Sequence, residues 1–274
     1  MSELSAPESL PLGKVTWQRG GGVALLTLTN PPANGYSYDM MRDLDQAILR
    51  ARMDDEVHVI VVAGAGEKFF CAGADIGMLN DVTPAFKYMF CLHANETLSR
   101  LEHTPKLTIA ALGGHCVGGG LEVALACDLR IARRGRGKTG LPEVSLGVLP
   151  GTGGTQRLAR ALGKSRSIEM MITGDLIDFD AAADLGLVNR VIDAESEADF
   201  LAQCLAWART FCPPGRASMA VGHIKRAVQS GVEVPLEQGL ALERELQAKL
   251  FASEDAQEGI AAFVERRAAV FTGR

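Results

Sequence analysis

The feature that most limits the fold is a pair of short, mostly apolar runs at residues 57–63 and 107–112. A strand with one wet face would alternate apolar and polar residues, so these runs indicate strands that are covered on both faces. A helical pattern at 84–102 lies between them. Strands that alternate with helices in this way predict an α/β fold with a parallel sheet.

The neighbouring segments fit the same architecture. Three glycines at 20–22 separate two β-rich runs, which predicts a hairpin. Asp39 opens a stretch of helical periodicity and can cap its start. The further predicted elements are strands at 15–19, 23–29, 129–132 and 187–192 and helices at 39–53 and 118–127.

The chain changes character after about residue 150, where the β signal fades. Prolines punctuate four helical stretches, at 195–212, 215–229, 235–251 and 253–267. We therefore expect a loose N-terminal tail at 1–13, an α/β core at 14–194 and a helical C-terminal region at 195–274.

Charge, hydropathy and cysteine usage limit the partners and the compartment. The formal net charge of −5 gives no support to general nucleic-acid binding. No apolar run approaches the roughly 18 residues of a membrane span, and residues 1–13 lack the Lys and Arg of a targeting signal. The six cysteines form no CxxC pair, which predicts buried, reduced thiols. We expect a cytoplasmic protein with no membrane partner.

Glycine is over-represented, with 30 residues clustered mainly at 64–77, 113–120 and 135–154. Glycine lets the backbone approach a ligand closely, so chemistry that uses backbone amides is expected. Nucleotide-binding motifs are incomplete: Phe69 stands where a dinucleotide fingerprint needs its third glycine. The five histidines are scattered, so no metal site is expected.

An apolar run enters a loop of small residues at 69–76, with the sequence FFCAGADI. Backbone N–H groups at the start of a helix have no internal acceptor, so this turn can present them to an anion. The alternative is a plain strand-to-helix connection that Asp75 caps. The pattern alone leaves both interpretations open.

Two carboxylates stand alone in apolar, glycine-rich surroundings. Glu122 is the only charged residue between positions 116 and 127, and Glu143 is the only one between 139 and 156. Burial raises the pKa of a carboxyl group toward the range of general acid–base catalysis. The alternatives are a structural buried glutamate at 122 and a first-turn carboxylate at 143, after Pro142.

These features together suggest one chemistry, in which free amides stabilise a developing oxyanion and two carboxylates transfer protons. Glycoside hydrolysis also uses two carboxylates. Its sites usually offer aromatic platforms, however, and this chain contains only two Trp and three Tyr.

Three stretches resemble the crotonase superfamily, specifically the enoyl-CoA hydratase/isomerase family: FFCAGADI, HCVGGGLEVALACDLRIA and LPEVSLGVLPGTGGTQRL. The stretch PLEQGLALERELQAKLFASEDAQEGIAAFVERR is similar to that family as well. The resemblance implies an α/β, crotonase-like spiral of ββα units with a C-terminal helical trimerisation region. It also implies a homotrimer or a hexamer, and an acyl-CoA thioester substrate. No separate cofactor is implied, because coenzyme A is part of the substrate.

By position, the resemblance implies an oxyanion hole made by the amides of Ala74 and Gly119. It places the two catalytic glutamates at Glu122 and Glu143 and a glycine near the catalytic water at Gly151. We expect Glu122 to be the base that activates the water and Glu143 to be the acid.

Other residues are expected to contact the substrate. Phe263, and a basic residue such as Arg266 or Arg267, would reach the CoA of a neighbouring subunit; helix packing and a solvated basic face are the alternatives. The backbone that is expected near the adenine and pantetheine belongs to Cys71, Ala72, Asp75 and Ile76.

The chain departs from the family's pattern in three places. Gly77 stands where many relatives carry a lysine that faces the CoA phosphates. Asn34-Gly35-Tyr36 replaces the common Asn-Ala-Leu beside the acyl pocket, so Tyr36 is expected to alter the chain-length preference. The stretch 133–138 is unusually basic, which we interpret as a solvated loop, with a CoA-phosphate contact or RNA binding as alternatives.

Three functions compete on this evidence. An enoyl-CoA hydratase, or the reverse dehydratase, leads because both glutamates are present. The second is a Δ3,Δ2-enoyl-CoA isomerase or an acyl-CoA decarboxylase of the same superfamily. The third is a non-catalytic CoA- or RNA-binding member. The sequence leaves the acyl group open, and with it the choice between fatty-acid, branched-chain and secondary metabolism.

Overall fold

The computed structural model describes residues 3–274, and it describes their side chains except at positions 76, 79 and 81. Its strands form two sheets. The larger sheet has the order β1 (Glu8–Ser9), β2 (Val15–Gly20), β3 (Val23–Leu28), β4 (Val59–Gly64), β6 (Leu107–Leu112), β8 (Leu129–Arg133) and β11 (Arg190–Ile192). The smaller has the order β10 (Ile177–Asp178), β9 (Lys138–Gly140), β7 (His115–Val117) and β5 (Phe69–Cys71).

Successive strands alternate between the two sheets. The chain runs from β4 to β5, from β6 to β7 and from β8 to β9, each time leaving the larger sheet for the smaller one. A helical segment follows each pair: α2 (Ile76–Asp81) and α3 (Pro84–Glu102), then α4 (Gly119–Leu125), then the 3-10 turn η1 (Glu143–Leu146). The pairs β4–β6, β6–β8, β5–β7 and β7–β9 are all parallel. The predicted spiral of ββα units is therefore confirmed.

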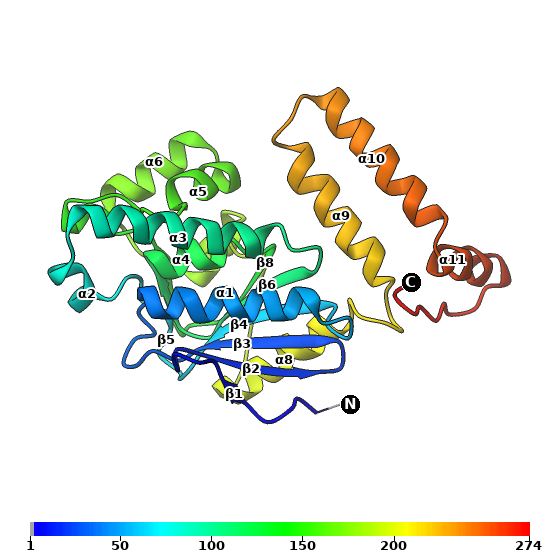
Figure 1. Cartoon of the computed structure of the whole chain (residues 1–274), viewed down its shortest axis with the longest axis horizontal. Helices are drawn as coiled ribbons and strands as arrows, with labels where there is room; N and C mark the ends of the chain where they lie inside the picture. The colour runs from blue at the N-terminus through cyan, green and yellow to red at the C-terminus, as the bar shows by residue number, and fades with distance from the viewer. Residues whose placement is uncertain (1–2) are drawn as a thin grey trace.

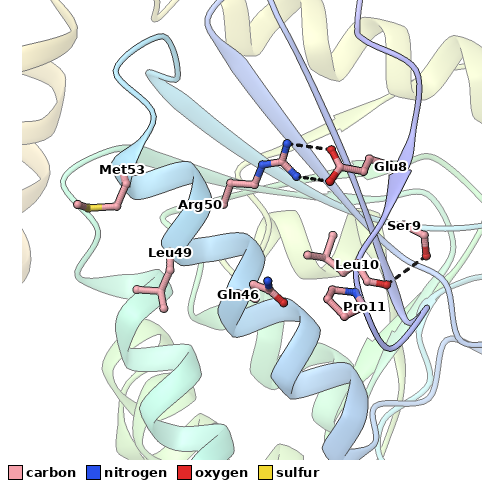
Figure 2. Close-up of a pocket in the computed structure, with 8 residues that line it drawn as sticks. All are labelled: Glu8, Ser9, Leu10, Pro11, Gln46, Leu49, Arg50 and Met53. Carbon is pink, nitrogen blue, oxygen red and sulfur yellow. Dashed lines mark hydrogen bonds and ion pairs between the residues drawn. The ribbon is translucent and has the colours of Figure 1, made fainter.

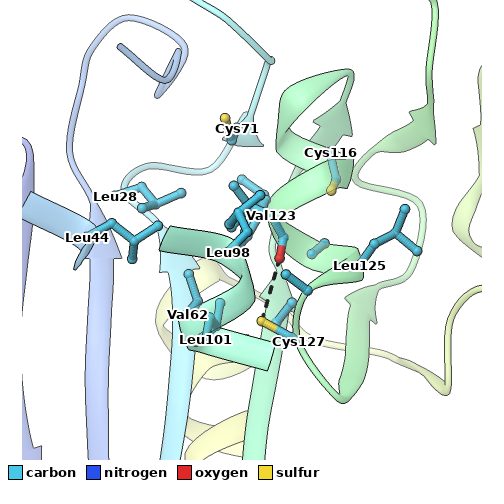
Figure 3. Close-up of a cluster of buried hydrophobic side chains, with 14 of the residues drawn as sticks. Leu28, Leu44, Val62, Cys71, Leu98, Leu101, Cys116, Val123, Leu125 and Cys127 are labelled. Atoms are coloured by element: carbon cyan, nitrogen blue, oxygen red, sulfur yellow. Dashed lines mark hydrogen bonds between the residues drawn. The ribbon is translucent and has the colours of Figure 1, made fainter. Parts of the chain in front are cut away.

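The larger sheet is covered on both faces, which explains its apolar strands (Figure 1). Alternate residues of β4 belong to different buried clusters: Ile60 packs with α1 (Tyr38–Met53) and α3, whereas Val61 packs with α8 (Glu197–Arg209). Figure 3 shows the first cluster, in which Cys71, Cys116 and Cys127 lie among leucines and valines. All six cysteines are free thiols.

Helix α1 begins at a different cap from the expected one. The Oγ of Ser37 accepts a hydrogen bond from the amide of Met40 at 3.3 Å, while Ser37 itself keeps extended backbone angles. Asp39 therefore lies inside the first turn, where its charge is favourable near the positive end of the helix dipole. The prediction of Asp39 as the cap was wrong by two residues, because both residue types suit that position.

The N-terminal segment is not a loose tail within its described part, from residue 3 onward. Glu8 and Ser9 pair with Trp17 and Thr16, so that β1 covers the open edge of β2. The apolar Leu10 is buried, and the carboxylate of Asp43 accepts backbone N–H bonds from residues 12 and 14 at 3.1 and 2.8 Å. The edge of the hairpin explains why this segment is held in place. The backbone N–H and C=O groups of β2 would otherwise lack partners on that side, and β1 pairs with them.

Helix α8 packs against the sheet rather than with the helices that follow it. Phe200, Cys204 and Ala208 recur at intervals of four residues, and all three are buried against β3, β4 and β6. The expected boundary at residue 194 thus separates α8 from the sheet that it covers. The three helices α9 (Ser218–Gly231), α10 (Leu236–Phe251) and α11 (Glu254–Glu265) project away from the core as an arm (Figure 1).

Two helices between η1 and β11 were not predicted: α6 (Lys164–Thr173) and α7 (Phe179–Asp184). By contrast, α5 (Gly154–Leu162) begins in the glycine run 151–154, where the sequence indicates a helix start. Within residues 3–274, none of the helices combines the length and apolarity that crossing a membrane requires.

Candidate active site

Two backbone amides converge where β5 and β7 end. Tyr36 forms an isolated bridge with Ala74, in which the amide of Tyr36 donates to the carbonyl of Gly73 at 2.8 Å and the amide of Asp75 donates to the carbonyl of Tyr36 at 3.0 Å. These bonds do not use the amide of Ala74. Gly119 is the first residue of α4, where an amide has no acceptor within the helix.

The backbone segments that carry these amides approach closely because glycine occupies positions 73 and 118, where a side chain would not fit. A Cβ added at Gly73 would lie 3.2 Å from the amide nitrogen of Gly119, and Gly73 has a positive φ of 92°. A Cβ at Gly118, whose φ is 57°, would lie 2.9 Å from Oε1 of Glu143. Side chains at either glycine would therefore separate the backbone segments or displace the carboxylate. The structure therefore places Gly73, the neighbour of Ala74, beside Gly119, and Gly118 beside Glu143.

Glu122 lies in α4 and is only 1% exposed. Its Oε1 accepts hydrogen bonds from the backbone amides of Thr152 at 2.8 Å and Gly154 at 2.7 Å. Its Oε2 accepts a short hydrogen bond from the Thr152 hydroxyl and a longer one, 3.4 Å, from the Tyr36 hydroxyl. Among the described residues no cation pairs with this buried carboxylate, but both of its oxygens accept hydrogen bonds, which compensates its lost hydration.

Glu143 is in a different environment. It lies in η1 and is half-buried, and its Oε2 is buried without a hydrogen-bond partner among the described residues. Burial raises its pKa from 4.5 to about 7, and the negative charge of Glu122 acts in the same direction, whereas its own backbone amide and Lys87 oppose the rise. The site therefore holds one carboxylate fixed by donors and one that titrates near neutral pH. Such a pair can divide acid and base roles.

The residues expected to contact CoA are placed in several ways. The carbonyl of Cys71 lies so close to Gly120 that a Cβ there would overlap it, and burial raises the pKa of the Cys71 thiol to about 12. The amide of Ala72 donates to the carbonyl of residue 33 at 3.0 Å. The carboxylate of Asp75 caps α2 by accepting from the amide of Met78 at 3.0 Å. Its side chain is therefore used as a helix cap. The side chain of Ile76 lies outside the described part.

Gly151 lies beside α3, since a Cβ there would be 3.2 Å from the sulfur of Cys91. The structure does not bring Phe263 and Arg267 to the two glutamates of the same chain, because the arm carries them away from α4 (Figure 1). Phe263 is 85% exposed. The guanidinium of Arg267 is bonded to Glu258 and Glu265.

The basic stretch 133–138 does not form a continuous charged surface. Arg133 is buried, and Arg134 forms ion pairs with Asp180 and Asp193. An open hollow of about 520 Å³ between β1 and α1 lies outside the site too (Figure 2). Its lining residues are Glu8, Ser9, Leu10, Pro11, Gln46, Leu49, Arg50 and Met53.

Sequence reasoning missed the two hydroxyl groups that bond to Glu122. Tyr36 was expected only to border the acyl pocket, and Thr152 was one polar residue within a glycine run. The position of Thr152, between two glycines that precede a helix, could have indicated this role. Free amides at a helix start attract an anionic group, and a hydroxyl in the same loop can then bond to that group as well.

Comparison with known proteins identifies the family of this chain. A family model described as enoyl-CoA hydratase/isomerase matches residues 18–274. The chain belongs to the enoyl-CoA hydratase/isomerase family. It is 36% identical over 259 residues to a short-chain-enoyl-CoA hydratase of Clostridium acetobutylicum. The aligned region covers 94% of this chain and 97% of that protein. It is 41% identical over 261 residues to a probable enoyl-CoA hydratase of Rhizobium meliloti, with 93% and 96% covered.

Solved structures of this family show the same fold. An enoyl-CoA hydratase structure from Geobacillus kaustophilus superposes with a TM-score of 0.92 at 43% identity and covers all of both chains. One from Bacillus anthracis gives a TM-score of 0.87 at 29% identity, with 100% and 99% covered. The resemblance to the crotonase superfamily is therefore confirmed.

Proposed function

We propose that this protein is an enoyl-CoA hydratase, which adds water across the C2–C3 double bond of a 2-enoyl-CoA thioester or removes it in the reverse direction. The observation that carries the proposal is the meeting of Glu122 and Glu143 with the amides of Ala74 and Gly119 in one site. The catalytic use of each of these groups is part of the proposal.

The two amides act on the thioester carbonyl. Hydrogen bonds from Ala74 N–H and Gly119 N–H would withdraw electron density from C3 and stabilise the enolate-like charge that develops as water adds. One such donor is typically worth about 3 kcal/mol in the transition state. The amides are held by backbone pairing and by a helix start, so they need no rearrangement when the charge appears.

The two carboxylates move the protons. Glu122 removes a proton from the water as its oxygen bonds to C3, and Glu143 delivers a proton to C2. Glu143 suits the acid role because burial raises its pKa to about 7, so that about half of the molecules carry a proton on it at neutral pH. The product gains one water in total. No resident cofactor takes part in this scheme, since coenzyme A enters as part of the substrate.

We propose that Tyr36 borders the acyl pocket beside the oxyanion amides. Its ring lies over Gly119 so closely that a Cβ there would overlap it, and it stacks on Phe90 at 5.7 Å between ring centroids. We propose that this ring restricts the acyl group beside the thioester carbonyl and so sets the chain-length preference.

We also propose that the protein is a cytoplasmic homotrimer or hexamer that does not bind nucleic acid. The free cysteines suit a reducing compartment. In the stretch 133–138, Arg133 is buried and Arg134 is ion-paired, which leaves Arg136 and Lys138 as its exposed basic side chains outside the described ion pairs. The arm exposes apolar side chains that a neighbouring subunit would cover. They include Ile224, Val228, Val232, Leu236, Phe251, Phe263 and Val264. The approach of Phe263 and Arg267 to a neighbour's CoA stays a prediction.

The test is the turnover of crotonyl-CoA, followed by loss of the enoyl-thioester absorbance. The wild type should turn it over rapidly, and Glu122→Gln and Glu143→Gln should each be slower by about 10²-fold or more. Glu195→Gln is a matched control, because it removes an exposed carboxylate from the loop before α8. A wild type that is inert on 2-enoyl-CoA but converts a 3-enoyl-CoA would make the protein an isomerase.

A further inference from the structure

Two hydroxyl groups meet on one oxygen of Glu122. The Thr152 hydroxyl donates to Oε2 in a short hydrogen bond, and the Tyr36 hydroxyl lies 3.4 Å from the same oxygen. The two hydroxyls are also 3.1 Å apart. The three groups therefore form a compact, buried cluster, in which the two hydroxyl hydrogens are available to one carboxylate oxygen.

We propose that Thr152 and Tyr36 are positioning residues, which together fix the Glu122 carboxylate in the orientation that activates water and link it to the oxyanion hole. This inference rests on the proposed hydration reaction. Neither residue needs to touch the reacting atoms, because each acts through Glu122.

Thr152 holds the carboxylate from two sides. Its backbone amide donates to Oε1 at 2.8 Å while its hydroxyl donates to Oε2. The amide of Gly154, in the same loop, adds a second bond to Oε1 at 2.7 Å. Rotation of the carboxylate about its terminal bond would break bonds on both oxygens at once. The loop therefore defines one orientation of the group.

Tyr36 connects this carboxylate to the oxyanion amides. Its backbone forms an isolated bridge with Ala74, its ring covers Gly119, and its hydroxyl reaches Glu122. A shift of the Tyr36 backbone would move the oxyanion donor and the carboxylate partner together. One residue thus couples the group that stabilises charge to the group that accepts the proton.

The ring of Tyr36 also packs against Phe90, so a role in packing alone is the competing explanation. The charged and titratable groups around Glu122 also matter for any pH measurement. They are Glu143 in η1, Cys91 in α3, Cys71 in β5 and Tyr36 itself, while Arg157 in α5 binds the carbonyl of Thr152.

The kinetic test uses variants that keep the shape and remove only the hydroxyl. Thr152→Val and Tyr36→Phe should each lower kcat about tenfold or more and leave KM within about twofold, because a mispositioned base affects the transition state more than binding. Thr152→Ser should restore kcat, because it returns the hydroxyl that donates to Oε2 of Glu122.

Packing alone would predict a different pattern. In that case Tyr36→Phe would retain full kcat, and Thr152→Ser would have no higher kcat than Thr152→Val. That outcome would overturn the inference. Tyr36→Phe keeps the ring and Thr152→Ser keeps the hydroxyl, so these two variants still decide the question if Thr152→Val fails to fold.

Crystal structures separate this inference from the proposed reaction. In the Thr152→Val/Tyr36→Phe double variant, the Glu122 carboxylate should be rotated or disordered, whereas in Thr152→Ser it should stay on the amides of residues 152 and 154. A carboxylate that keeps its wild-type position in the double variant refutes positioning. If the wild type is inert on every acyl-CoA, hydration fails as the function, but these structures still decide whether the hydroxyls position Glu122.

Discussion

The protonation of Glu143 should control the pH dependence of hydration. Its side chain is half-buried, one of its oxygens has no partner among the described residues, and burial raises its pKa to about 7. If Glu143 delivers the proton to C2, only its protonated form is active. Raising the pH through neutrality should therefore remove activity.

The size of the effect follows from the titration. One pH unit below its pKa, about nine-tenths of a single group is protonated, and one unit above only about one-tenth is. Since the pKa of Glu143 is about 7, kcat/KM for crotonyl-CoA should fall about tenfold per pH unit once the pH exceeds that value. The kcat/KM profile reports the free enzyme, which is the state that the structure describes.

Initial rates at low substrate, measured from mildly acidic to alkaline pH, test this expectation. The basic limb should appear near pH 7 in the wild type and in Glu195→Gln. In Glu143→Gln the rate should be lower by about 10²-fold and the limb should vanish, because a carboxamide does not titrate. An activity that rises through pH 7, or a limb that survives in Glu143→Gln, would refute the acid role.

Three further predictions concern packing and stability. Gly119→Ala should lower kcat/KM by about 10²-fold or more, because its Cβ would overlap the Tyr36 ring and displace an oxyanion donor; steady-state kinetics checks this. Lys225→Met should destabilise the protein by about 3–5 kcal/mol in urea unfolding, because it leaves the largely buried Asp128 without its cation at 2.9 Å, and adding Asp128→Asn should recover part of the loss. Between pH 4.5 and about 7 the folded wild type binds more protons at Glu143 than the unfolded chain does, so its stability should fall with rising pH over that window relative to Glu143→Gln, as melting temperatures would show.

Much of the fold follows from local patterns. The hairpin around residues 20–22, the buried strands β4 and β6 and the helices of the arm lie where periodicity, glycine and proline predict them. These signals are strong because each element buries one face or both. In the smaller sheet the sequence indicated only the apolar run that becomes β5. The strands β7, β9 and β10 were missed, since two or three residues carry no periodicity and their pairing depends on distant segments.

The errors have tertiary causes. The loose tail was wrong because β1 forms only when β2 offers a free edge, which no local pattern reveals. The boundary at residue 194 ignored the face of α8 that packs on the sheet, and a helical pattern does not say which neighbour will cover it. Helices and strands were thus easier to predict than the elements against which they pair or pack.

The sequence indicated the two carboxylates of the site but not the hydrogen bonds that hold Glu122. Glu122 and Glu143 are visible because a lone charge in an apolar, glycine-rich segment needs an explanation. The hydroxyls of Tyr36 and Thr152 lie 86 and 30 positions away from Glu122 in sequence. Only the spiral brings these segments together, so the contacts that orient the base could not be read from the chain alone.

The measurement that tests the central claim most directly is the mass of the product formed from crotonyl-CoA in water enriched in oxygen-18. Two-carboxylate hydration predicts a product that is heavier by one water and carries one oxygen-18, formed by the wild type and at least about 10²-fold more slowly by Glu122→Gln. An unchanged acyl mass, or label uptake that Glu122→Gln does not slow, would contradict the account.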